Sequence, residues 1–255
     1  MAISRREFIQ ASAAFCATRC LAQPTAAAND LSLTVCKYGE AVITESMVFQ
    51  GGNKDKFVPI SLLFHLIRLP GRVILADAGC DSFSIFGRAA TKFVKPADLL
   101  RRRGIRPEDV TDILISHHHS DHMESVTSFP QARIVIHRDE AKRGAGYLKG
   151  HRGEIVRFDE SISLFDGRLS MLRVGGHTSG SSLVLIPRGP KTVVLAGDAC
   201  YLGACLTQRR PTGTTGNLAE SQAFVDTYSA PNYIVRLCHD PDVLPGTNGF
   251  LDLSV

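Results

Sequence analysis

Tryptophan is absent from this 255-residue sequence, and aromatic residues make up only 7% of it, so no stacking platform for sugars or bases is indicated. Long hydrophobic runs are also missing, since the uncharged stretch at residues 8–18 is much shorter than the roughly 20 apolar residues of a membrane-spanning helix. The net charge of +4 is small and scattered, which excludes a charge-driven nucleic-acid binder. With 44% hydrophobic and 21% charged residues, the composition is that of a globular protein and excludes a disordered or collagen-like chain.

The first residues indicate export. The segment SRREFI at residues 4–9 resembles the twin-arginine export signature, and the alanines at residues 26–28 offer a cleavage site. The alternative is that the paired arginines only begin a first helix. We expect residues 1–28 to be a twin-arginine signal peptide recognised by the twin-arginine export machinery, and residues 29–255 to be a single domain. This predicts a periplasmic or secreted protein with no stable membrane anchor.

Cysteine usage does not indicate a disulfide framework. Two of the seven cysteines lie in the predicted signal peptide, which leaves Cys36, Cys80, Cys200, Cys205 and Cys238. Five is an odd number, and the spacings contain no CxxC pair. An oxidising compartment allows one disulfide, but the sequence does not assign it.

Apolar runs bounded by glycine and proline alternate with helical segments along the mature chain. We expect strands at residues 31–44 (with a bend at Gly39), 61–67, 73–75, 113–115, 132–136, 169–174, 182–186, 193–195 and 233–237. Helices are expected near residues 97–103, from about residue 139, and near residues 220–227. This order predicts sheets covered by helices, an α/β layered fold.

Ligand-type residues follow several of these predicted strands directly. The motif HHHSDH at residues 117–122 comes after one of them and offers four such side chains in diverging directions, which is more than one metal ion requires. Further along the chain, His177 lies in a glycine-flanked loop, Asp198 ends an AGD segment, and His239 begins HDP. Loops beyond strand ends are where functional groups collect. The pattern therefore predicts a site with two metal ions.

The order HxHxDH, then Gly-His, then Gly-Asp, then a late histidine resembles the metallo-β-lactamase superfamily of binuclear metallohydrolases, over essentially all of residues 29–255. The resemblance implies a four-layer αββα sandwich with the site along one edge, between two sheets. It implies two divalent ions, most consistent with zinc, although manganese, iron and cobalt accept the same ligands. One ion would be held by His117, His119 and His177, the other by Asp121, His122 and His239, with Asp198 bridging both.

Two further residues gain a role from the resemblance. Asp77 follows a predicted strand, where an aspartate supports the ligand histidines of the family by hydrogen bonding; the alternative is a simple strand-end turn. Tyr201 lies three residues after Asp198, and lactonases of the superfamily carry a tyrosine at this spacing with its hydroxyl near the substrate carbonyl. The alternative is a packed tyrosine. His65 and His137 fall outside the motif pattern and are expected to be structural.

The implied chemistry is hydrolysis of a small molecule. A hydroxide that bridges the two ions attacks a lactone or ester carbonyl, because metal binding lowers the pKa of water to about 7. Tyr201 would donate a hydrogen bond to the carbonyl oxygen, and Asp121 or a metal ion would help to protonate the leaving alkoxide. No serine in a Gly-x-Ser-x-Gly context offers itself as a nucleophile.

Comparison within the superfamily favours an N-acyl homoserine lactonase-like enzyme. Asp198 argues against a β-lactamase, and the short segment after His239 argues against a glyoxalase-type thioesterase. His119 argues against the flavin-linked oxygen reducers. The nucleases of the superfamily carry insertions that this sequence does not contain. The sequence departs from the common pattern of its relatives at residues 123–125 and 178–181. Both segments flank the expected pocket mouth, so the acyl-chain preference stays open. The alternatives are an exported organophosphate triesterase or other esterase of the superfamily, and a non-catalytic metal-binding module.

Overall fold

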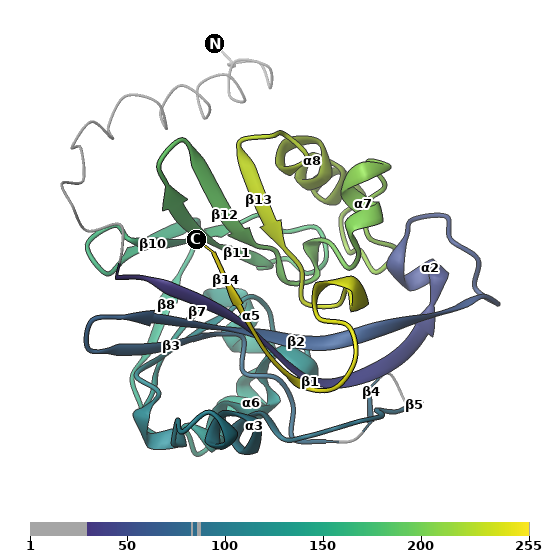
Figure 1. Cartoon of the computed structure of the whole chain (residues 1–255). Coiled ribbons are helices and arrows are strands. Elements are labelled where there is room, and N and C mark those ends of the chain that lie inside the picture. Colours follow the sequence, from purple (N-terminus) through teal and green to yellow (C-terminus); the bar gives the residue numbers. More distant parts are fainter. Residues whose placement is uncertain (1–29, 83, 86–87, 255) are drawn as a thin grey trace, which may run out of the picture. The chain divides into compact units, whose positions relative to one another are not determined.

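Two large β-sheets stack face to face in the computed structural model, and helices cover their outer faces (Figure 1). The structure describes residues 30–254, except residues 83, 86 and 87. The predicted signal peptide, residues 1–28, lies outside the described residues and stays a prediction. The described chain from Leu31 onward belongs to one unit.

The first sheet has, among the described residues, seven strands in the order β14-β1-β2-β3-β6-β7-β8. Their bounds are β14 (Gly249–Leu253), β1 (Ser32–Thr44), β2 (Phe57–Leu69), β3 (Arg72–Ala76), β6 (Asp112–Ile115), β7 (Arg133–His137) and β8 (Ile155–Phe158). From β3 to β8 neighbouring strands pair in parallel, and the other pairs are antiparallel. The β1–β2 register shifts between Lys37 and Gly39, which confirms the predicted bend.

The second sheet has the strand order β13-β12-β11-β10-β9 in the described chain. Its strands are β13 (Tyr233–Arg236), β12 (Lys191–Leu195), β11 (Ser182–Arg188), β10 (Leu169–Arg173) and β9 (Ser161–Leu164). Only β12 and β13 pair in parallel within this described sheet. A separate short hairpin joins β4 (Ser84–Ile85) to β5 (Arg88–Ala89).

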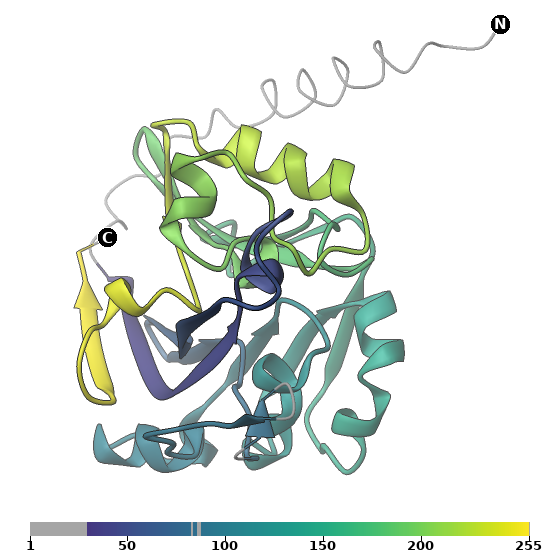
Figure 2. The same cartoon turned by 90° about the vertical axis from the view of Figure 1, so that its right-hand side faces the viewer.

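The helices form the outer layers of the sandwich, as the two views in Figures 1 and 2 show. The helices on the side of the first sheet are α3 (Pro96–Arg102), α5 (Arg138–Arg143) and α6 (Ala145–Leu148), and those on the side of the second are α7 (Gly203–Thr207) and α8 (Leu218–Tyr228). Short helices α2 (Glu45–Val48) and α4 (Ser120–Met123) lie in loops. The predicted αββα sandwich is confirmed. Within the described residues, no helix has the length and apolar character needed to span a membrane.

Strand β6 shows how the layers are filled. Ile113 and Ile115 belong to one buried cluster, which includes Leu99 and Leu100 of α3, while Leu114 belongs to a second cluster with strands of both sheets. A strand that is covered on both faces carries apolar residues at successive positions, because side chains alternate between the two faces of a sheet. The apolar run at residues 113–115 is therefore explained by burial on two sides.

The glycine-rich loop after β10 contains a position that only glycine suits. Gly176 has φ of +78°, a backbone conformation that is unfavourable for residues with a side chain. A Cβ atom there would also lie 2.6 Å from the Ser221 hydroxyl oxygen and 3.0 Å from the Ser221 backbone nitrogen. The loop can therefore pack against the start of α8 only because this residue is glycine.

We expect Gly176→Ala to lower the free energy of unfolding by about 1–2 kcal/mol from the backbone conformation alone, with a further loss from the contact with Ser221. Gly146→Ala is the matched control, because a Cβ at Gly146 meets nothing within 4 Å. The control is expected to be neutral or slightly stabilising, since alanine favours helix. Urea denaturation of both variants measures the difference, and equal stabilities would contradict the assignment.

Candidate metal centre

Parallel strand pairs bring the polar residues that follow them to one edge of the sheets. Strand β3 pairs in parallel with β6, so Asp77 and Ser116 follow neighbouring strand ends. Strand β12 pairs in parallel with β13, and Asp198 and His239 follow those ends in the same way. Because parallel strands end at the same edge of a sheet, side chains far apart in the sequence converge there.

Asp77 links two of the converging segments. Its carboxylate accepts hydrogen bonds from the Ser116 backbone N–H (2.8 Å) and hydroxyl (2.9 Å). Its Oδ2 also lies 2.9 Å from Nδ1 of His122. The backbone φ of Asp77 is 63°, a strained conformation that persists only where the surroundings enforce it. Asp77 thereby fixes both the turn after β6 and the orientation of the His122 ring.

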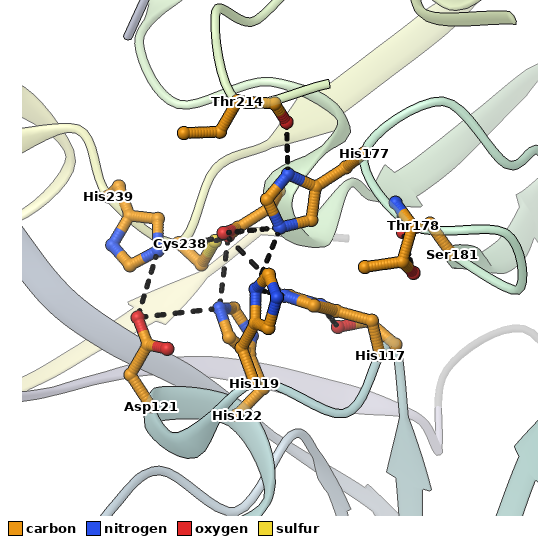
Figure 3. Close-up of polar contacts among 12 residues, drawn as sticks. His117, His119, Asp121, His122, His177, Thr178, Ser181, Thr214, Cys238 and His239 are labelled. Atoms are coloured by element: carbon orange, nitrogen blue, oxygen red, sulfur yellow. Dashed lines mark hydrogen bonds and ion pairs between the residues drawn. The ribbon is translucent and has the colours of Figure 1, made fainter. Parts of the chain in front are cut away.

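Ligand-type atoms gather in two adjoining groups. In what we call the first group, these atoms lie within 4.8 Å of one another and come from His117, His119, His177 and Asp198. The His119 Nδ1 lies 3.0 Å from His117 Nε2 and 2.9 Å from His177 Nε2. Asp198 Oδ2 lies 3.6 Å from His117 Nε2 and 3.4 Å from His177 Nε2. Figure 3 shows the three rings turned toward one another.

The second group, by the same distance criterion, contains His122, Asp198, Cys238 and His239. Asp198 Oδ1 lies 3.0 Å from Nε2 of His122 and 3.0 Å from Nε2 of His239. Asp121 Oδ2 lies 3.7 Å and 3.5 Å from the same two nitrogens, and Figure 3 shows both contacts. Asp198 therefore belongs to both groups and directs one carboxylate oxygen to each.

The hydrogen bonding of these groups fits divalent metal ions. Asp121 Oδ2 is buried and has no hydrogen-bond partner in the described chain, and the buried Nε2 atoms of His122 and His239 face only the carboxylate oxygens of Asp198 and Asp121, without the geometry of a hydrogen bond. The outward ring nitrogens do have partners: His239 Nδ1 lies 2.9 Å from the Ser61 carbonyl, and His177 Nδ1 faces the Thr214 carbonyl. Metal-ligating histidines bind the ion through one nitrogen and donate the other N–H to the protein, and this is the arrangement seen. Imidazole and carboxylate donors suit zinc.

Burial and mutual proximity set the protonation states in the centre. Burial, followed by the nearby His177, lowers the pKa of His119 to about 4. Burial and the neighbouring His122 hold the pKa of His117 well below its ordinary value. Burial opposes ionisation of Asp198, but the surrounding histidines, His122 above all, outweigh it and hold the pKa of that carboxyl well below its usual range. Burial is outweighed at His122 by the charge of Asp198, and at His239 by Cys238 and Asp198, so the pKa of each of these two rings is raised well above its ordinary value. Neutral imidazole and ionised carboxylate are the forms that bind metals, so a metal that binds in the second group displaces protons from these rings.

Tyr201 is fully buried against the centre. Its hydroxyl donates to Asp198 Oδ2 (2.8 Å) and accepts from Thr214 Oγ1 (3.1 Å). The ring stacks on His239, with centroids 4.9 Å apart. Burial, followed by the charge of Asp198, raises the pKa of Tyr201 well above its ordinary value, so the hydroxyl is a proton donor at neutral pH.

Other histidines lie outside both groups. Burial within β2 lowers the pKa of His65 to about 4. His137 ends β7, and its Nδ1 accepts a hydrogen bond from the Asp139 N–H at the start of α5. His118, between two members of the first group in sequence, turns its backbone N–H and its ring nitrogen toward Glu140.

Two residues at the centre were missed by the sequence interpretation. Glu140 is fully buried and accepts hydrogen bonds from the Thr178 hydroxyl and the Gly180 N–H, 2.8 Å each, in addition to those from His118. Nothing in the sequence distinguishes Glu140 from Asp139, the acidic residue before it. Cys238 brings its sulfur within 3.5 Å of an oxygen of Asp198, and its place directly before a ligand-type histidine was the available signal.

Comparisons with known proteins agree with this geometry. Residues 63–232 match the family model of the metallo-beta-lactamase superfamily. The N-acyl homoserine lactonase AiiB of Agrobacterium fabrum (strain C58) is 27% identical to this chain over 213 residues, which cover 66% of this chain and 77% of that protein.

Solved structures of the same fold include an N-acyl homoserine lactone hydrolase with the product N-hexanoyl-L-homoserine at its catalytic metal centre. It superposes with a TM-score of 0.71 at 18% identity, covering 83% of this chain and 94% of that one. The dizinc quorum-quenching lactonase AidC superposes with a TM-score of 0.68 at 17% identity, covering 88% and 95%. These likenesses show the fold, and the family match extends over most of the chain. The protein belongs to the metallo-beta-lactamase superfamily, as its motifs predicted.

Proposed function

We propose that this protein is a binuclear metal-dependent lactonase that hydrolyses the ring ester of N-acyl homoserine lactones. The observation that carries the proposal is the carboxylate of Asp198, because Oδ2 faces one group of histidines and Oδ1 faces the other. A carboxylate in this position suits two divalent ions that share one ligand. The lactonases among the relatives support the choice of a lactone substrate.

In this proposal seven residues hold two ions, with His117, His119 and His177 at one, Asp121, His122 and His239 at the other, and Asp198 at both. Asp121 is included because its buried Oδ2 has no hydrogen-bond partner in the described chain and lies 3.7 Å from His122 Nε2. Zinc suits these donors best, and manganese, iron and cobalt accept the same set.

When bound, the two ions would lower the pKa of water to about 7 and would act as Lewis acids toward the carbonyl oxygen. The chain's own residues orient the reaction. The Tyr201 hydroxyl keeps Thr214 as its donor and exchanges Asp198 for the substrate carbonyl oxygen, on which negative charge develops. Asp121 would take the proton that remains on the attacking water oxygen and pass it to the alkoxide that leaves when the ring ester bond breaks, so that the products are a carboxylate and an alcohol.

The first test is hydrolysis of N-hexanoyl-homoserine lactone by the purified full chain. We expect zinc-loaded protein to turn over the lactone, chelator-stripped protein to lose this activity, and re-added zinc to restore it, because the nucleophile depends on the ions. Titration of the acid released on ring opening, at constant pH, measures the rate, with metal content determined on the same samples.

Protein that holds two zinc ions per chain and leaves the lactone intact would overturn the lactonase proposal. Two further substrates then separate the alternatives. Turnover of a phosphotriester would indicate a phosphoryl substrate, whereas inertness toward lactones, esters and phosphotriesters would indicate a metal-binding module.

Tyr201→Phe tests the proposed hydrogen bond to the carbonyl oxygen. We expect the variant to keep its zinc content and to lose kcat by about 10- to 1000-fold, the range for one hydrogen bond formed in the transition state. Tyr233→Phe is the matched control, because Tyr233 lies at the opposite end of β13 from the metal centre. A Tyr201→Phe variant as active as the control would remove Tyr201 from the mechanism.

A further inference from the structure

A pocket of about 510 Å³ adjoins the first group and includes His119 and His177 in its lining. Its other walls come from segments that are distant in the sequence. Arg143 ends α5, Arg173 ends β10, and Asn217 caps α8. A substrate held at the proposed metal centre therefore has this pocket open to the part of the molecule beyond its reacting carbonyl.

The side chains that line this pocket are mostly polar or charged. None of its eleven residues is aliphatic, and none is phenylalanine, tyrosine or methionine. Small-molecule pockets are ordinarily lined by hydrophobic and aromatic side chains, with a few polar groups for orientation. A long alkyl chain placed here would lie largely against charged and polar groups, so it would gain less from binding than it would in an apolar pocket.

One positive charge in the lining of the pocket has no carboxylate as its partner. Arg173 is paired with Glu220, whose Oε1 lies 3.0 Å from its guanidinium, and the second Glu220 oxygen accepts the Gly176 N–H at 2.8 Å. Arg143 has no salt bridge in the described part of the chain. The nearby carboxylates of α5 are bound to the loop after β10, as the 2.8 Å bond from the Gly180 N–H to Glu140 shows. One guanidinium therefore remains for a ligand.

Building on the lactonase proposal, we propose that this pocket binds a carboxylate carried on a short acyl group of the substrate, and that Arg143 is its partner. A guanidinium matches a carboxylate through two parallel hydrogen bonds. Asn217 can add a third, because its side-chain oxygen caps α8 by accepting from Ala219 and Glu220 and its amide NH₂ is left as a donor. The proposed substrates are thus homoserine lactones whose short acyl group ends in a carboxylate.

The test compares two lactones of equal size that differ in charge, N-succinyl-homoserine lactone and N-succinamoyl-homoserine lactone. We expect the zinc-loaded full chain to prefer the succinyl compound by about 5- to 10-fold in kcat/KM, with the difference mostly in KM, because Arg143 contributes to binding and not to chemistry. Arg143→Gln should remove this preference, mainly by raising the KM of the succinyl compound.

Lys142→Gln is the matched control, since Lys142 and Arg143 are both exposed neighbours on α5 and only Arg143 lines the pocket. It is expected to keep the wild-type preference. Arg143→Lys retains the charge without the planar guanidinium, and we expect it to keep part of the preference. Equal rates on both lactones in the wild type, or a preference that survives in Arg143→Gln, would overturn the proposal.

Calorimetric titration with the same two lactones keeps this proposal separate from the lactonase proposal. If neither lactone is hydrolysed, tighter binding of the succinyl compound to the wild type than to Arg143→Gln still supports the pocket, and only the lactonase proposal fails. Equal binding to both proteins would contradict the pocket, whatever the turnover.

Discussion

The carboxylate of Asp198 is buried between two groups of histidines, and this buried charge constrains everything around it. Taking a carboxylate out of water is unfavourable unless hydrogen bonds or opposite charge compensate. The neighbouring imidazoles hold its pKa well below the usual range, and the Tyr201 hydroxyl donates to one of its oxygens. Two divalent ions would supply the larger part of the positive charge, which explains why so many donor atoms converge on a single aspartate.

The fold can bury this many polar groups because several of the histidines have a second contact away from the centre. Asp77 and the carbonyls of Ser61 and Thr214 each take the outward nitrogen of one histidine. Such contacts fix the tautomer and direction of a ring before a metal binds. Parallel pairing of β3 with β6 and of β12 with β13 sets the positions of the loops themselves. The sandwich therefore acts as a rigid frame, and the chemistry is left to its edge.

Much of this arrangement was predictable because the ligand-type residues directly follow strands that are apolar at successive positions, as β6 is. Strands β8, β9 and β14 were not predicted, because they are mostly half-buried or exposed and carry no continuous apolar run. Glu140 and Arg143 could not be identified either. Glu140 is bound to the loop after β10, and Arg143 lines the pocket beside that loop, and no local pattern in the sequence contains either arrangement.

In the proposed function the metal ligands determine which reaction is catalysed. The residues that line the pocket determine which lactones are accepted as substrates. The proposed reaction depends on Asp198 holding two ions side by side. Anomalous diffraction at the zinc edge, from crystals of the zinc-loaded protein, tests this most directly. The account predicts two zinc peaks, both in contact with Asp198, one among the histidines of each group. A single peak, or a second peak away from Asp198, would contradict it.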